Sequence, residues 1–296
     1  MNKNANTQRI SGEGKVYKSS REKAFRRFFK TKVNVIGLIL VGLILMMTIS
    51  SFVFNVDPAK MDVSAIRKPP GYNGHLLGTD TLGRDILARL MIGSRISIFI
   101  SLTVVFSSTM IGMLLGLISG FFGGIVDAII GRIVDVLLSF PGILLLLVIM
   151  ATFGGGIWVV IFAMTVGGVP GTIRLMRERV LSLRTRNYVI AAHILGASSW
   201  YNMIRHILPN AITPILVSAA LSIPGVIMGE AGLSYLGLGV PPPTPSWGKM
   251  IADGQSLIEF APWISIFPGL CILMATLGFN LLGDGIRDFL DPTQQR

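Results

Sequence analysis

The chain has few residues that could do chemistry, and the most unusual of them lie inside long apolar segments. Two carboxylates, Asp135 and Glu230, fall within segments built otherwise of aliphatic residues. An ionisable group inside a membrane is costly unless it is paired or hydrated. Two explanations stay open. Asp135 is close enough to Arg132 in sequence to pair with it, whereas a carboxylate facing an aqueous pathway would meet the amino group of a solute.

The other reactive residue types do not form a catalytic or metal site. His75, His193 and His206 are scattered along the chain, and Cys271 is its single cysteine. One cysteine excludes an internal disulfide and any cysteine-based metal centre. Ser234 lies in GLSYLG, which is faintly similar to an intramembrane serine protease, but no histidine lies in an apolar segment to activate it. The sequence therefore predicts neither an enzyme nor a metal site.

Composition indicates which elements hold these residues. Of the 296 residues, 51% are hydrophobic and only 14% are charged, whereas soluble domains contain about 25% charged residues. A membrane-spanning helix needs about 20 predominantly apolar residues. Six segments meet that requirement, which predicts an all-α polytopic membrane protein: 33–54, 96–122, 133–153, 157–176, 211–236 and 263–283. The first segment is too long for a signal-peptide core of about 7–15 residues.

The distribution of basic residues predicts the direction of the spans. Ten of the 26 lysine and arginine residues precede residue 33, and six more lie between 174 and 205. Lysine and arginine accumulate on the cytoplasmic side of membrane proteins. Both termini are therefore expected in the cytoplasm, with 1–32 forming a basic cytoplasmic tail. The same location explains the net charge of +11 without a nucleic-acid partner.

Two loops are expected on the outer side. In the first, residues 55–95, Asp80 is a candidate N-cap for a short amphipathic helix lying at the membrane interface, with Ile86, Leu87, Leu90 and Met91 on its apolar face. The second, 237–262, contains VPPPTPSWGKM and should be extended and stiff, because proline cannot donate a backbone hydrogen bond. It either contacts a partner or merely links two helices. Residues 96–296 form the expected five-helix core.

The stretch AAHILGASSWYNMIRHILPN, 191–210, is too polar to cross a membrane. Gly196 and Pro209 bound a short helix at about 197–208, which Ser198 can cap. Its apolar stripe would face the bundle, and a polar face would point away, formed by Tyr201, Asn202 and Arg205. The stripe consists of Trp200, Met203, Ile204, Ile207 and Leu208. Such a helix either closes the bundle or docks a cytoplasmic partner.

The order of residues in this stretch resembles the EAA motif of importer-type ABC transporter permeases. Ala191, Ala192, Gly196, Leu208 and Pro209 occupy matching positions, although Ile190 replaces the usual glutamate and His206-Ile207 also departs from the pattern. In that family the segment is a coupling helix that sits in a cleft of the ATP-binding subunit. The resemblance implies an ATPase-coupling site formed by Ala191, Ala192, Gly196, Ala197, Ser198, Tyr201, Asn202, Arg205, Leu208 and Pro209.

Further motifs resemble the dipeptide/oligopeptide/nickel permease family, most closely its C-type subunit. They are GTDTLGRD (78–85), GEAGLSYLGLGVPPPTPSWGKM (229–250), APW (261–263) and FNLLGDGIRDFLDP (279–292). The resemblance implies half of a translocation pathway in an ATP-driven peptide importer. It also implies three kinds of partner: a homologous B-type permease, two cytoplasmic ATPases and an extracytoplasmic substrate-binding protein. A nickel-chelate importer of the same family is the alternative, followed by an ion-coupled secondary transporter.

The sequence bears independently on the energy source. A phosphate loop of the form G-x-x-x-x-G-K-[ST] is not present, because the two Gly-Lys pairs, Gly14-Lys15 and Gly248-Lys249, are followed by Val16 and Met250 and not by Ser or Thr. The chain is therefore expected to bind no cofactor itself. ATP and magnesium would be held by partner subunits.

Overall fold

The structure is a computed structural model that describes residues 28–29, 31–54 and 56–290. The predicted basic tail, 1–32, falls almost entirely outside these residues. The described part of the chain is helical and contains isolated β-bridges but no strand. Its main helices are α2 (Lys32–Val53), α3 (Ile86–Phe122), α4 (Gly124–Ser139), α5 (Gly142–Phe153), α6 (Ile157–Arg184), α7 (Asn187–Ile194), α8 (Ser199–Asn202), α9 (Leu208–Tyr235), α10 (Trp247–Gly254) and α11 (Trp263–Leu290).

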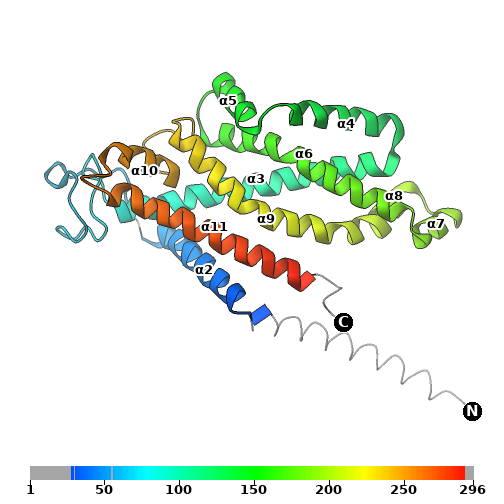
Figure 1. The fold of residues 1–296 in the computed structure, drawn as a ribbon, viewed down its shortest axis with the longest axis horizontal. Helices are drawn as coiled ribbons and strands as arrows, with labels where there is room; N and C mark the ends of the chain where they lie inside the picture. Colours follow the sequence, from blue (N-terminus) through cyan, green and yellow to red (C-terminus); the bar gives the residue numbers. More distant parts are fainter. Residues whose placement is uncertain (1–27, 30, 55, 291–296) are drawn as a thin grey trace, which may run out of the picture.

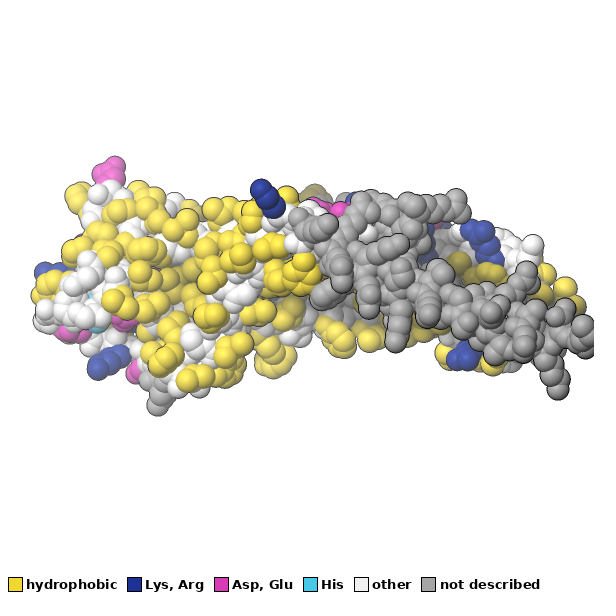
Figure 2. Space-filling model, turned by 90° about the horizontal axis from the view of Figure 1, so that it is seen from below, with side chains coloured by type: hydrophobic (Ala, Val, Ile, Leu, Met, Phe, Trp, Pro, Cys, Tyr) yellow, Lys and Arg dark blue, Asp and Glu magenta, His cyan; other side chains and the backbone are white. Residues whose placement is uncertain are grey.

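These helices form an elongated bundle with two different ends (Figure 1). Helices α3 and α6 pack along their lengths, α9 packs on both α3 and α11, and α2 packs on α11. One end carries α7 and α8 and is called here the α7–α8 end. The opposite end carries residues 56–85 and α10 and is called the loop end. Figure 2 shows hydrophobic side chains over much of one long face of the bundle, as expected for a surface in contact with lipid or with another apolar chain.

Within residues 28–29, 31–54 and 56–290, five helical runs are long and apolar enough to cross a membrane, and α4 with α5 makes a sixth crossing if the pair is one span. The predicted span 133–153 is not one straight helix, because α4 and α5 are bent by 91°. Pro141 explains the break: it lacks an N–H, and its ring forces the residue before it out of the helical region. Phe140 is accordingly extended, with φ −87° and ψ 136°.

The predicted interfacial helix in the first outer loop is also corrected. Residues 86–93 are the first turns of α3, which continues without a break to Phe122. The N-cap is Asp85, which accepts a hydrogen bond from the Ala88 N–H, and not Asp80. Ile86 and Leu90 are buried in the protein core rather than facing lipid. At 1.5 Å per residue α3 is about 55 Å long, well beyond a hydrocarbon core of about 30 Å.

Glycines bring α3 and α6 into close contact. A Cβ atom added at Gly112 would lie 2.5 Å from the Thr172 side chain, and one added at Gly116 would lie 2.6 Å from the Ile173 carbonyl oxygen. Small residues at such positions let two membrane helices approach until their backbones touch. Near the α7–α8 end α6 is also joined to α4, because Arg177 of α6 donates two hydrogen bonds to Asp127 of α4, at 2.5 and 2.6 Å.

Candidate functional site

The α7–α8 end is built around one glycine turn. Helix α7 ends at Ile194, and Gly196 follows with φ +88°, a conformation that glycine adopts at little cost. The Ser198 side chain then caps α8 by accepting a hydrogen bond from the Tyr201 N–H at 3.2 Å. The predicted break at Gly196 and the predicted cap at Ser198 are both confirmed.

The predicted separate helix at 197–208 is only partly correct, because Pro209 does not end it. Helix α8 is followed by one π-helical turn, Met203–Ile207, which leads directly into α9. Pro209 lies in the first turn of α9. Proline removes a backbone donor and crowds the carbonyl four residues earlier, and a wide π-turn relieves that crowding. The helical run from Ser199 to Tyr235 therefore links the α7–α8 end to the membrane span without an intervening loop.

The wide turn changes which side chains face the bundle. Met203 and Ile207 are fully buried with Met176 and Val180 of α6, as the predicted stripe requires. Trp200 and Ile204, predicted to share that stripe, are instead 59% and 57% exposed. Asn202 was assigned to the polar face but is buried, and its Oδ1 has no hydrogen-bond partner in the described part of the chain. A regular 3.6-residue period does not hold through a π-turn, which is why the predicted faces fail here.

The result is an exposed apolar surface, which we call the α7–α8 surface. It is formed by Ile194, Leu195, Trp200, Tyr201 and Ile204, each more than half exposed. The coupling residues predicted from the motif surround it: Ala191, Gly196, Ser198, Arg205 and Pro209 are exposed, whereas Ala192, Ala197 and Leu208 are partly buried. The motif did not single out Ile194 and Leu195, although their apolar character next to Gly196 was a usable signal. Contiguous exposed apolar groups of this kind mark interaction sites.

Asp135 has a different partner from the one its sequence position suggests. Its carboxylate lies 2.8 Å from the Arg174 guanidinium, which links α4 to α6, and not beside Arg132. Both side chains are more than half exposed. The sequence pointed to the neighbour on the same helix, whereas the bent α4–α5 pair brings Asp135 to another helix. A role in a pathway stays a prediction.

Glu230 is enclosed within the protein and has no exposed surface. Its carboxylate accepts hydrogen bonds from Ser97 of α3, at 3.0 Å, and from Ser234 of α9, at 2.7 Å. Ser246, the N-cap of α10, in turn donates to the Ser234 hydroxyl at 3.1 Å. This arrangement joins three helices, which favours the structural alternative for Glu230 over an exposed position in a pathway.

Nothing in these arrangements assembles a metal site. Among the described residues, no group of three or more His, Cys, Asp or Glu side chains could hold an ion. Ser234 donates to a carboxylate and has another serine beside it, and neither can act as the general base of a serine hydrolase.

Fold and site together define a multi-pass helical membrane protein that presents an apolar helical surface at one end. The chain belongs to the family described as "Binding-protein-dependent transport system inner membrane component", whose model matches residues 112–296. A second model, "N-terminal TM domain of oligopeptide transport permease C", matches residues 19–70. The chain is thus a membrane component of a transport system and not an enzyme, and the predicted family resemblance is confirmed.

Relatives match over nearly the whole chain. The oligopeptide transport system permease protein OppC of Bacillus subtilis (strain 168) is 42% identical over 91% of this chain and 88% of its own. The dipeptide transport system permease protein DppC of Escherichia coli (strain K12) is 42% identical over 90% of this chain and 92% of its own. The di/tripeptide transport system permease protein DppC of Pseudomonas aeruginosa (strain UCBPP-PA14) is 38% identical over 94% and 93%.

Among solved structures, an amino acid ABC transporter aligns with a TM-score of 0.45 and 18% identity over 63% of this chain and 88% of its own. A likeness at that level carries no argument about fold or function.

Proposed function

We propose that this chain forms half of the translocation pathway of an ATP-driven importer of di- or oligopeptides. The observation that carries the proposal is the match, over at least nine tenths of the chain, to permeases named for oligo-, di- and tripeptides. Those names favour peptides over nickel chelates. An ion-coupled secondary transporter is disfavoured, because it would have no use for an exposed apolar surface at the α7–α8 end.

The proposed assembly places a homologous B-type permease beside this chain, two ATPases on the cytoplasmic side and a substrate-binding protein outside. The α7–α8 surface would dock one ATPase, which places that end and both termini in the cytoplasm. The six lysine and arginine residues between 174 and 205 support that orientation. ATP and magnesium would be bound by the ATPases.

Coupling would be mechanical. Closure of the ATPase pair would displace α8, and the helical continuity from Ser199 to Tyr235 would carry the displacement into the membrane. Pro214 and Pro224 lie inside α9 and give it places to bend. The far end of α9 is held by the hydrogen bonds of Glu230 and Ser234. Displacement would therefore bend α9 between a moving end and an anchored end, and this bending is the proposed basis of alternating access.

The experiment is deletion of this subunit in its native cell, followed by uptake of a labelled tripeptide and of radioactive nickel, measured side by side. A second strain restores the subunit with Gly196→Asp. We expect peptide uptake to disappear on deletion and to stay low with the variant. Selective loss of nickel uptake would move the substrate to nickel chelates. Persistence of both uptakes would overturn the substrate assignment.

A matched control isolates the coupling step. Gly154 has φ +85°, close to the +88° of Gly196, and an added Cβ atom at either position meets no heavy atom within 4 Å. Gly154 lies between α5 and α6, away from the α7–α8 surface. Gly154→Asp should therefore support uptake at matched membrane levels. Uptake by Gly196→Asp equal to that of Gly154→Asp would rule out the coupling role.

A further inference from the structure

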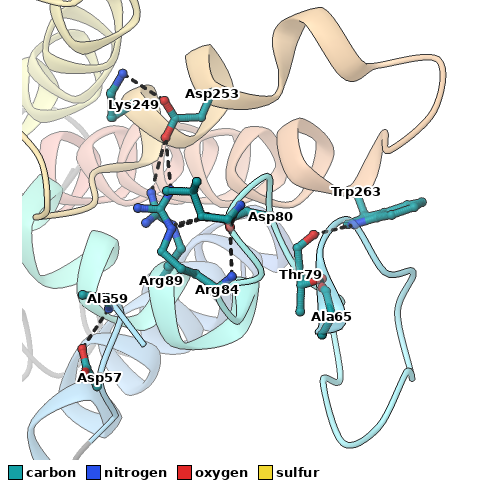
Figure 3. A network of polar contacts seen from close by, with 11 residues as sticks. Asp57, Ala59, Ala65, Thr79, Asp80, Arg84, Arg89, Lys249, Asp253 and Trp263 are labelled. Atoms are coloured by element: carbon teal, nitrogen blue, oxygen red, sulfur yellow. Dashed lines mark hydrogen bonds and ion pairs between the residues drawn. The ribbon is translucent and has the colours of Figure 1, made fainter. Parts of the chain in front are cut away.

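The GTDTLGRD motif builds a cluster of charges at the loop end, which Figure 3 shows from close by. Asp80 lies at its centre and is almost completely buried. It accepts hydrogen bonds from the N–H groups of Leu82 and Arg84, both at 2.9 Å, and from the Arg84 guanidinium at 2.7 Å. The Arg89 Nε lies 3.4 Å from the same carboxylate. One carboxylate thus faces two buried guanidinium groups.

A second carboxylate reaches the cluster from α10. Asp253 Oδ2 lies 3.5 Å from Arg89 Nη2 and 4.0 Å from Arg84 Nη2, and its other oxygen lies 2.9 Å from Lys249 Nζ. The five side chains carry three positive and two negative charges, so the cluster has a net charge of +1. Both arginines have side chains at most 9% exposed, whereas Lys249 and Asp253 are 28% and 22% exposed. The excess positive charge therefore borders solvent, where an anion can reach it.

One polar atom in the cluster lacks a partner. Arg89 is 3% exposed, and its Nη1 makes no hydrogen bond in the described part of the chain. Arg89 also lines a cavity of about 260 Å³. Its wall includes the cations Arg84 and Lys249, the carboxylate of Asp253, and Pro242, Pro243 and Thr244. The prolines present no N–H donors of their own, and their apolar rings lower the local polarity, which strengthens the field of the cations.

We propose that this cavity is a carboxylate-binding site at the extracytoplasmic mouth of the permease. A carboxylate supplies the single negative charge that the cluster lacks and matches the planar donor fork of a guanidinium. A doubly charged phosphate would exceed the charge available. The placement at the outer mouth rests on the proposed function. Two sources carry the required group: the terminal carboxylate of a transported peptide, and an acidic side chain of the protein that delivers it.

The test uses the assembled importer in vesicles, with Thr244→Cys placed in the cavity wall. The native Cys271 is buried. We expect a negatively charged thiol reagent to react at Thr244→Cys about tenfold faster than a neutral reagent of the same size, because the cationic cavity concentrates anions. A tripeptide with a free carboxyl group should slow the reaction, whereas the same tripeptide with a C-terminal amide should not.

Protection by the delivering protein alone, without free peptide, would keep the carboxylate site and assign its source to that protein. Adding Arg89→Gln to Thr244→Cys should abolish both the charge preference and the protection. If that variant does not accumulate, Lys249→Gln at the cavity rim should reduce both. Equal rates for the two reagents with no protection from either source would overturn the site. If the importer carrying Thr244→Cys kept the preference for the negatively charged reagent but took up no peptide when ATP was supplied, the carboxylate site would stand and only the proposed function would be contradicted.

Discussion

The two ends of the bundle differ in the side chains that they bury and expose. At the loop end, the charged side chains of 80–89 and 249–253 meet one another inside the chain, and the Trp263 indole donates to the Thr79 carbonyl at 3.2 Å. At the α7–α8 end, five large apolar side chains lie exposed. The loop end exposes large apolar side chains as well, among them Val63 and Leu76, so the two ends differ chiefly in the buried charge cluster that is described at the loop end.

The largest effect should come from breaking the loop end at Asp80. Asp80→Asn leaves two buried guanidinium groups with only the more exposed Asp253 as a counterion, and loss of one partner of a buried ion pair costs about 3–5 kcal/mol. We expect little folded protein in the membrane, measured as protease-resistant full-length chain. Asp57→Asn is the control, because Asp57 is exposed and accepts only a local hydrogen bond from the Ala59 N–H. Equal yields of the two variants would show that the cluster is not structural.

The next largest effect is expected at Leu195, where a substitution should reduce peptide uptake without destabilising the fold. Its side chain is 87% exposed, so Leu195→Ser should change the free energy of unfolding by less than about 0.5 kcal/mol. Peptide uptake should nevertheless fall about tenfold or more, because truncation of a central interface residue typically costs about 2 kcal/mol of binding. Leu76→Ser is the control, since Leu76 is 68% exposed at the loop end. Equal uptake by both variants would contradict docking at the α7–α8 surface.

The smallest effect is expected from the ion pair between Arg177 and Asp127, near the α7–α8 end. Asp127→Asn weakens the two hydrogen bonds from Arg177. Because these side chains are 22% and 41% exposed, solvent screening limits the loss to about 1 kcal/mol. Thermal unfolding in detergent would measure it. If Asp127→Asn destabilised the protein as much as Asp80→Asn does, the buried charges of the loop end would not be more important for stability than the exposed ion pair near the α7–α8 end.

Much of the fold follows from the sequence because long apolar runs must become membrane helices. The Gly196 turn and the Ser198 cap were predictable for the same kind of local reason. The predictions that failed concern residues whose environment is set by tertiary contacts. Asp80 looked like an N-cap because its partner Arg89 lies on another element, α3. Glu230 looked like a pathway group because its hydroxyl donors include Ser97, 133 residues away.

The π-turn at Met203–Ile207 fixes the rotational phase between the α7–α8 surface and the membrane span. Each residue of an α-helix turns the chain by about 100°. Deleting one residue from this turn would leave the hydrophobicity of α9 unchanged but would swing Trp200 and Tyr201 around to another side of the bundle. The length of this turn should therefore tolerate neither insertion nor deletion, whereas substitutions at its exposed positions change only local contacts.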